Sequence, residues 1–324
     1  MRESEGMPRH ALPQEMGLSF RVGEARRAGV RRARLDAPDL ERIFHGGRVR
    51  RERFGVADDE PPWVRERHDL ERRIAAYLPL LPAGAFFTGP TAAHLWEAPL
   101  PMGIHDRLHV AVHHPRTAPL RAGIRGVQVL PRMARVVTRH GIPVTDPGTT
   151  WASLGGTLGL YDLVAVADAL IRVPRHPGGF RPPERAPFAS REDLAFALAA
   201  GRRRGAPLLR AALERARTGA SSRQESRLRL VLVDGGLPEP VLDHDVFGPL
   251  GFVGCLDAAY PDRRVGIEYE GDGHLTRAQL ERDIDKYEAL AALGWRIVRL
   301  TSHHIDRAPG EAVRRVRAAL SQHR

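Results

Sequence analysis

Acidic residues stand inside two apolar segments near the end of the chain. Asp257 interrupts the apolar segment 252–260, and Glu268 and Glu270 lie two residues apart in the segment 264–270. Residues two apart in a β-strand point to the same face, so both glutamates are expected on one face. If the two segments pair as neighbouring strands, Asp257 and Glu268 converge. Carboxylates in apolar strands repel one another and are costly to desolvate, and a divalent cation removes that cost.

These acids therefore predict a metal site. Hard oxygen ligands with few other donors favour Mg²⁺ or Mn²⁺ over zinc. The expected ligands are Asp257, Glu268 and the backbone carbonyl of Tyr269. The alternative is a purely structural role of the two acids, although apolar strands rarely carry unpaired acids.

The elements that must position these acids can be read from periodicity and from turn residues. A helix is expected over 222–233, with Ser222 as its N-cap and Glu225 at the reciprocal position of a capping box. Three strands, a long helix and a fourth strand follow, expected over 241–247, 252–260, 264–270, 276–293 and 295–300. The predicted order is helix, three strands, helix, strand.

This region, residues 221–324, resembles the PD-(D/E)XK nuclease superfamily, and specifically the small Vsr-like endonuclease domains of the actinobacterial type. The matching positions are Glu225, Asp257, residues 268–274 (EYEGDGH), Arg282 with Asp283, Lys286, and residues 294–299 (GWRIVR). The resemblance implies a restriction-endonuclease-like αβββαβ core and metal-dependent hydrolysis of DNA. The catalytic set that it implies is Glu225, Asp257, Glu268, Glu270, His274 and Lys286.

Glu270 stands where the superfamily carries a lysine. Another group must then polarise the attacking water or stabilise the pentacovalent phosphate. Lys286 or Arg282 could do so from the following helix, and Arg282 is also expected to contact the nucleic acid; otherwise both are ordinary exposed charges. His274 could be a general base or acid, because histidine titrates near neutrality, or it could simply bond the loop after the strand. Glu225 could likewise only cap its helix.

Charge is distributed unevenly along the 324 residues, whose net charge is +11. Residues 221–324 hold 15 basic and 16 acidic side chains, whereas residues 1–220 hold 35 basic and 23 acidic ones. Lys286 is the single lysine and asparagine is absent, a pattern of GC-biased coding that weakens arginine abundance as an argument for nucleic-acid binding. A basic surface joined to grouped carboxylates nevertheless suits nucleic-acid enzymology.

The front of the chain predicts a small basic domain. Residues 1–18 form an expected disordered leader, with Met16 near the true start, and residues 19–60 form a helix-turn-helix-like region. Its two short helices, within 20–35, join at Gly29, and residues 45–50 could form a hairpin or wing. The expected nucleic-acid contacts are Arg31, Arg32 and Arg34. The alternative is any basic helical hairpin.

Residues 61–172 are expected to form an α/β middle region, followed by a linker and helices over 173–220. The expected helices cover 70–80, 91–96, 147–154 and 162–172, and the expected strands cover 108–112 and 126–130. Four histidines, at 105, 109, 113 and 114, lack a carboxylate or cysteine at ligand spacing, which favours strand-surface histidines over a metal site.

The front region, residues 20–172, also has a weaker resemblance to antitoxin proteins of abortive-infection (AbiE-type) systems. It rests on the helix-turn-helix-like start and on residues 87–96 (FTGPTAAHLW) and 142–147 (IPVTDP). The resemblance implies a winged helix joined to an α/β region that regulates its own promoter.

Composition excludes several classes of protein. No apolar run approaches the roughly 18 residues that span a bilayer, and the start has no apolar segment of a secretory signal. The single Cys255 cannot form an internal disulfide, which suits a reducing cytosol. We therefore expect a cytoplasmic, multidomain α/β protein without membrane association.

Three functions compete. The first is a metal-dependent DNA endonuclease whose basic front region positions the nucleic acid. The second is a non-catalytic, antitoxin-like DNA-binding regulator with a degenerate nuclease domain. The third is a protein-interaction module. Expected partners are DNA, with RNA left open, a second copy of the chain, and a cognate toxin or defence-system protein.

Overall fold

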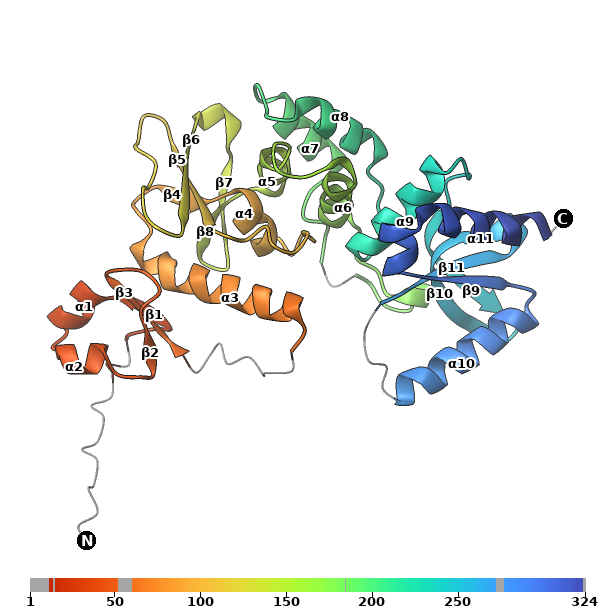
Figure 1. Cartoon of the computed structure of the whole chain (residues 1–324), viewed down its shortest axis with the longest axis horizontal. Helices are drawn as coiled ribbons and strands as arrows, with labels where there is room; N and C mark the ends of the chain where they lie inside the picture. The colour runs from red at the N-terminus through yellow and green to blue at the C-terminus, as the bar shows by residue number, and fades with distance from the viewer. Residues whose placement is uncertain (1–11, 14, 52–59, 184, 272–276, 323–324) are drawn as a thin grey trace, which may run out of the picture. The chain divides into compact units, whose positions relative to one another are not determined.

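The structure is a computed structural model that describes residues 12–13, 15–51, 60–183, 185–271 and 277–322. The chain is a mixed α/β protein, which confirms the expected class, and these residues form three sheets (Figure 1). It divides into two compact units. The first contains residues 1–91 and 102–145, and the second contains residues 92–101 and 146–324.

The first unit begins with a small sheet and two short helices. The antiparallel sheet has the order β1-β3-β2 and consists of β1 (Ser19–Arg21), β2 (Leu40–Glu41) and β3 (Gly47–Arg50). Between β1 and β2 lie α1 (Val22–Arg27) and α2 (Arg32–Leu35), so the two predicted helices exist but are only six and four residues long. Gly29 lies between them with φ +81°, a conformation that favours glycine.

The core of this small domain reaches into the segment expected to be a disordered leader. Phe20, Ala25 and Leu35 are buried together, and Leu12 is only 7% exposed against the same cluster. Residues 12–13 and 15–18 are thus attached to the domain. The remaining leader residues lie outside the described part of the chain.

The rest of the first unit is a five-stranded sheet with a long helix. Helix α3 spans Pro62–Tyr77, with proline at its first turn, and therefore begins well before the predicted residue 70, where apolar periodicity first becomes visible. The strand order is β6-β5-β4-β8-β7. The strands are β4 (Ala85–Phe87), β5 (Leu108–His113), β6 (Ile124–Val129), β7 (Val136–Arg139) and β8 (Ile142–Thr145). The sequence predicted only β5 and β6.

One histidine of this sheet is not on the surface, contrary to the expectation. His109 is only 7% exposed, and a Cβ atom at Gly89 would lie 2.9 Å from its Nδ1. Burial and the charge of Arg125 lower the pKa of His109 to about 4. Burial lowers the pKa of His105 to about 4 as well, with Arg73 and His109 contributing.

Helices lead into the second unit. Asp146 caps α5 by accepting a hydrogen bond from the Thr149 N–H at 2.8 Å. Helix α5 contacts α7, and α6 contacts α8 and α9. The helices between α3 and the carboxyl-terminal region are α4 (Gly89–Leu95), α5 (Pro147–Ser153), α6 (Leu160–Ile171), α7 (Arg191–Ala199) and α8 (Ala206–Arg215).

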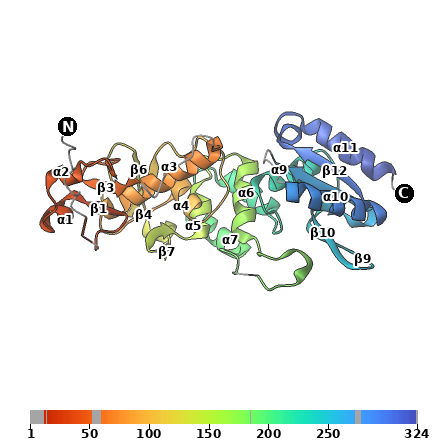
Figure 2. The ribbon, with the colours of Figure 1, turned by 90° about the horizontal axis from the view of Figure 1, so that it is seen from below.

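The carboxyl-terminal region has the predicted order of helix, three strands, helix and strand. Figure 2 shows this region in teal and blue. These elements are α9 (Arg223–Asp234), β9 (Val241–Gly248), β10 (Gly251–Tyr260), β11 (Val265–Glu270), α10 (Arg277–Ala292) and β12 (Arg296–Thr301). The sheet order is β12-β11-β10-β9, with β12 parallel to β11 and the other pairs antiparallel. A π-helical turn (His303–Arg307) and helix α11 (Pro309–Gln322) follow, neither of which was predicted.

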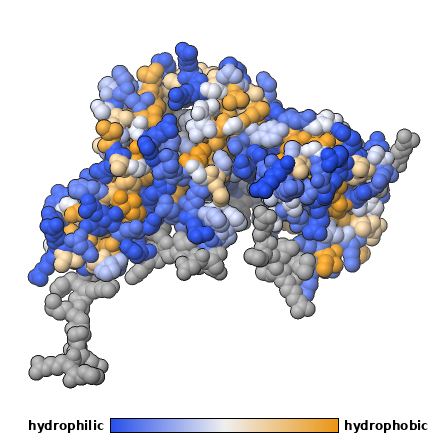
Figure 3. Space-filling view, viewed as in Figure 1, coloured by the Kyte–Doolittle hydropathy of each residue, from blue (hydrophilic) through white to orange (hydrophobic). Residues whose placement is uncertain are grey.

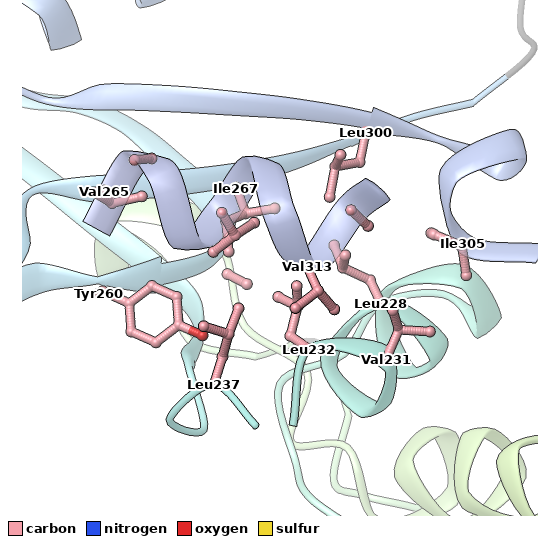
Figure 4. Packing of buried hydrophobic residues seen from close by; sticks show 14 residues of the cluster. Leu228, Val231, Leu232, Leu237, Tyr260, Val265, Ile267, Leu300, Ile305 and Val313 are labelled. Carbon is pink, nitrogen blue, oxygen red and sulfur yellow. The ribbon is translucent and has the colours of Figure 1, made fainter. Parts of the chain in front are cut away.

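Apolar side chains cover both faces of this sheet. On one face, Leu232 of α9 and Val313 of α11 pack with Ile267 of β11 (Figure 4). On the other, Leu290 of α10 packs with Leu256 of β10. Because helices cover both faces, Glu268 inside β11 is buried, and the other acids of these strands are only partly exposed.

Candidate functional site

Asp257 and Glu268 lie close together on neighbouring strands. Strands β10 and β11 are antiparallel, and Ala258 pairs with Ile267. Asp257 and Glu268 are the next residues beyond this pair, where the recorded pairing of the two strands ends, and their charges are close enough to interact. The Asp257 carboxylate accepts a 2.7 Å hydrogen bond from the Tyr269 N–H, which fixes it against β11.

Glu268 and Glu270 both contact helix α10, so they share a face of β11 as their spacing predicts. The Lys286 ammonium lies 2.6 Å from Glu268 Oε1. The Tyr287 hydroxyl donates to Glu270 Oε1 at 3.1 Å. The two glutamates therefore meet different partners on the same helix.

Lys286 reaches the carboxylates by crossing strand β10. Its Nζ also donates to the Cys255 carbonyl at 2.8 Å, so both contacts hold the ammonium beside Glu268. A Cβ atom at Gly254 would lie 2.9 Å from the Lys286 Cε and 3.1 Å from its Cγ. The absence of a side chain at position 254 makes room for this lysine.

Glu225 approaches the same acids from the first turn of α9. Ser222 caps the helix by accepting from the Glu225 N–H at 3.2 Å, as expected. The Glu225 carboxylate accepts from the Ser221 N–H at 2.6 Å, one residue before the N-cap, and not from the N-cap residue itself as the capping box predicted. Glu225 is near enough to Asp257 for the two charges to interact.

The electrostatics of these carboxylates are unusual. Burial, together with the neighbouring charge of Asp257, raises the pKa of both Glu225 and Glu268 to about 7. Burial also raises the pKa of Asp257, although the Tyr269 hydrogen bond and the Lys286 charge oppose this. The grouped acids would hold several negative charges only with additional positive charge, and perturbed carboxylates of this kind cluster at functional sites.

Glu270 behaves differently from the other three acids. Arg299 of β12 donates to Glu270 Oε1 at 2.5 Å, and this hydrogen bond is the main cause of a lowered pKa of Glu270. The Arg299 guanidinium also lies 5.1 Å from the centroid of the Tyr287 ring. Glu270 is therefore neutralised by an arginine at the margin of the group.

The other predicted site residues are dispersed. His274 lies outside the described residues. Arg282 is exposed on α10, and Arg31 and Arg32 are exposed in the small amino-terminal domain. Arg34 instead forms a two-pronged ion pair with Asp39, at 2.7 and 3.0 Å, and its side chain is only 12% exposed. The guanidinium of Arg34 is thus committed within the domain.

A further acid near Asp257, Asp243 of β9, was not predicted from the sequence. Leu242 pairs with Ala258 and His244 with Leu256, so Asp243 of β9 lies opposite Asp257. Asp243 has φ +52°, a strained conformation for a residue other than glycine. Asp243 and Asp245 are two residues apart, as Glu268 and Glu270 are in β11. This spacing was the signal in the sequence that could have identified them as members of the acidic group.

Arg175, from the segment expected to be a linker, is bound to these β9 acids. Its guanidinium lies 2.5 Å from Asp243 Oδ2 and 2.6 Å from Asp245 Oδ2. The Gly178 N–H donates to Asp245 at 3.0 Å, and Cys255 Sγ lies 3.1 Å from Asp243 Oδ1. This part of the predicted linker is docked onto the sheet.

The donors can be compared with the requirements of a metal. Within the described ranges, no three His, Cys, Asp or Glu residues are grouped closely enough to hold an ion. Asp257 and Glu268 remain two hard oxygen donors on neighbouring strands, with Glu225 nearby. The pKa values of Glu225 and Glu268 are raised mainly by burial and then by the charge of Asp257, and the Lys286 ammonium only partly opposes this at Glu268. The chemistry of the donors fits Mg²⁺ or Mn²⁺, although the number of ligands is small.

Comparisons with known proteins place the chain in a family. A scan against protein-family models finds no match. Uncharacterized protein MT2308 of Mycobacterium tuberculosis (strain CDC 1551 / Oshkosh) is 30% identical over 290 residues, which cover 87% of this chain and 96% of the relative. Uncharacterized protein Rv2248 of Mycobacterium tuberculosis (strain ATCC 25618 / H37Rv) matches with the same identity and coverage. The chain belongs to the family of these mycobacterial proteins.

Helix length and polarity also bear on location. Among the described helices, none combines the length and the apolar character that crossing a membrane would require.

Proposed function

We propose that the protein is a metal-dependent DNA endonuclease with a restriction-endonuclease-like core in residues 221–324. One observation carries the proposal. Asp257 and Glu268 lie close enough on neighbouring strands for their charges to interact, and Lys286 of α10 places an ammonium 2.6 Å from Glu268. The lysine absent from position 270 is thereby replaced by one that reaches the same acids from a helix.

Each residue has a part in the proposed reaction. Asp257 and Glu268 would hold Mg²⁺ or Mn²⁺, with the Tyr269 carbonyl as the further ligand expected from sequence. The chemistry that such an ion supplies when bound is activation of water and neutralisation of charge on the leaving oxygen. Lys286 stabilises negative charge on the phosphate that is attacked. Glu225, with a pKa of about 7, can accept or release a proton on its carboxylate near neutral pH.

The proposal extends to partners and location. The excess of basic residues before position 221 would position DNA by its phosphates, and RNA is the alternative substrate to be tested. A cytoplasmic location, a second copy of the chain and a cognate toxin or defence-system protein remain part of this proposal.

Nicking of supercoiled plasmid tests the proposal. With Mg²⁺ or Mn²⁺, we expect the wild-type protein to nick the plasmid and EDTA to abolish nicking. Asp257→Asn and Glu268→Gln should each reduce the rate by at least about a hundredfold, as expected for loss of a group that stabilises the transition state. Lys286→Met should reduce it by a similar factor.

The matched control is Asp262→Asn, which removes an acid from the exposed turn between β10 and β11. It should nick at the wild-type rate. Equal nicking by wild type, Asp257→Asn and Glu268→Gln would identify a contaminating nuclease and overturn the proposal. Running the assay with labelled RNA in parallel decides between the two nucleic acids.

A second candidate function rests on a specific observation. Glu268 is paired with Lys286 and Glu270 with Arg299, so two of the acids already have cationic partners. This favours a non-catalytic, antitoxin-like DNA-binding regulator that retains the nuclease shape. Calorimetric titration with Mg²⁺ separates the two functions. A nuclease should bind the ion and lose this binding in Asp257→Asn, whereas a regulator should give no heat of binding in either protein.

A further inference from the structure

A polar concavity of about 400 Å³ lies in the small amino-terminal domain, far along the chain from the carboxylate site. Helices α1 and α2 and the turn before β3 form its walls. Its charged and titratable lining residues are Arg26, Arg32, Asp36, Arg42, His45 and Arg48. In the view of Figure 3, the surface of this domain is dominated by hydrophilic residues. The lining of the concavity thus contains four guanidinium groups and one carboxylate.

Arg48 is fixed at the base of the concavity. Its Nε donates to the Leu35 carbonyl at 2.6 Å, and its Nη1 donates to the Gly47 carbonyl at 3.0 Å. Its Nη2 lies 2.8 Å from Asp36 Oδ1, and its side chain is only 10% exposed. Arg48 thus links α2 to β3. Its ion pair largely neutralises Asp36, the one acid among the lining residues.

The other arginines of the concavity have weak partners or none. Arg32 lies 4.0 Å from Asp36, beyond hydrogen-bonding distance. Among the residues that the structure describes, no hydrogen bond or ion pair involves the guanidinium of Arg26 or Arg42 or the imidazole of His45. Among the described residues, the concavity is thus lined by more cationic groups than its one acid, Asp36, can neutralise.

We infer that this concavity binds a phosphate group. Planar guanidinium groups match the oxygens of phosphate in a two-pronged geometry, and several of them together favour a phosphate over a single carboxylate. The phosphate could belong to a nucleic-acid backbone or to a small phosphomonoester, and the two sources share the same recognition chemistry. The inference concerns residues outside 221–324 and does not depend on cleavage, and its nucleic-acid outcome would deepen the proposed positioning of DNA by the basic front region.

The inference changes which arginines are expected to contact the ligand. Arg31 and Arg34, two of the residues chosen from sequence, do not line the concavity, and Arg34 is bound to Asp39. Arg26 and Arg42, which the sequence analysis did not select, do line it. The turn from β2 to β3 brings Arg42 beside α1, a neighbourhood that helical periodicity does not reveal.

Two binding measurements on the full-length protein test the inference, both in EDTA so that no cleavage occurs. The first is fluorescence anisotropy of a labelled DNA duplex, and the second is calorimetric titration with inorganic phosphate at constant ionic strength. The test variant is the double substitution Arg26→Ala/Arg42→Ala. The matched control is Arg27→Ala/Arg65→Ala, which removes two exposed arginines of the same unit that lie outside the concavity.

We expect the test variant to bind at least one probe at least about tenfold more weakly than wild type, and the control to change less than about twofold. If the duplex is the ligand, the slope of log affinity against log salt should fall by about two, one unit for each lost phosphate contact. Loss confined to inorganic phosphate would assign the site to a small phosphomonoester, and loss confined to the duplex would assign it to the backbone.

Equal weakening by the test and control variants would overturn the inference, because it would show only the effect of net charge. If the wild-type protein binds neither probe, the inference is overturned as well. Both variants substitute exposed side chains, so their thermal unfolding should match that of wild type. Arg26→Lys/Arg42→Lys provides a second check, since it keeps the charge but loses the two-pronged geometry, and should recover binding only in part.

Discussion

Arg229 and Asp168 form a buried ion pair between helices α9 and α6. Their nitrogen and oxygen atoms lie 3.2 Å apart, and the two side chains are 2% and 1% exposed. Asp168 also accepts from the Ser226 hydroxyl at 2.8 Å and from the Arg217 N–H at 2.6 Å. This network attaches the carboxyl-terminal domain to the helices that precede it within the second unit.

Removing one partner of this pair should be costly. We expect Arg229→Ala to lower the free energy of unfolding by about 3–5 kcal/mol, because it leaves Asp168 buried without its cationic partner. Arg314→Ala, on the exposed face of α11, should change it by less than about 0.5 kcal/mol. Urea unfolding followed by circular dichroism measures both. A loss in Arg229→Ala no larger than that in Arg314→Ala would contradict the importance of the pair.

His109 should make the first unit sensitive to acid. Its folded pKa of about 4 lies below the ordinary value of 6.5, so the unfolded chain binds more protons between these values. Stability is therefore fully present above pH 6.5 and is lost as the pH falls toward 4, by an amount on the order of 3 kcal/mol.

Unfolding temperatures between pH 4 and pH 8 test this dependence. His109→Gln should make the acidic limb shallower without removing it, because glutamine carries no titrating group whereas His105, whose pKa is also lowered to about 4, remains. His140→Asn, at an exposed turn of the same unit, should keep the wild-type profile. An unchanged acidic limb in His109→Gln would assign the pH dependence to other groups.

At the scale of elements, the docked segment around Arg175 shows that composition alone is a poor guide to linkers. The residues 173–190 are rich in proline, glycine and arginine, which predicts a linker. Yet Arg175 binds Asp243 and Asp245, and the Phe180 ring lies 5.8 Å from the ring of Phe252. Side-chain pairing with a distant strand holds the segment.

Arg175→Ala should release this segment from the sheet. Phe180 is already 71% exposed, so limited digestion with chymotrypsin should cut after it several-fold faster in the variant than in wild type. Arg202→Ala, an exposed position in the same unit, is the control and should be cut at the wild-type rate. Identical cleavage in all three proteins would show that Arg175 does not hold the segment.

The periodicity of the sequence predicted most helices and strands of residues 221–324, but it missed several elements elsewhere and the last helix. Alternation and turn residues located β10, β11 and β12 to within two residues, and the spacing of Glu268 and Glu270 correctly predicted their common face. Helix α11 was missed although Ala312, Val313, Val316 and Ala319 show helical spacing. Strand β4 was missed because three residues are too few to show a period.

The candidate site was only partly predictable for a related reason. Asp257, Glu268 and Lys286 each stand out by residue type, but whether Lys286 reaches Glu268 depends on how α10 packs on the sheet. The roles of Asp243 and Arg175 depend on pairing between distant segments. Such contacts leave no trace in the periodicity of either segment.

At the scale of the whole molecule, the two compact units each have their own buried residues. The first contains the clusters around Phe20 and Phe86, and the second contains those around Leu232 and Leu256. The excess of basic side chains lies before position 221, whereas the grouped acids lie after it. Buried cores thus occur in both units, whereas the excess of basic residues occurs only before position 221.

Separate cores predict separate unfolding transitions. We expect scanning calorimetry to show two transitions, because cooperativity is a property of a single packed core. His109→Gln should change the pH dependence of only one of them, and Arg229→Ala should lower only the other. A single transition that both substitutions shift together would show that the two units unfold as one.

Because Gly254 has no side chain, we expect positions 254 and 286 to be correlated among the members of this family. A lysine at position 286 can lie across β10 only while position 254 stays small, so the two sites are expected to change together. A relative with a bulky residue at the first site should have lost the lysine at the second, or should carry its positive charge elsewhere. Aligned sequences would then reveal, from one pair of columns, which members kept the ammonium beside their acids.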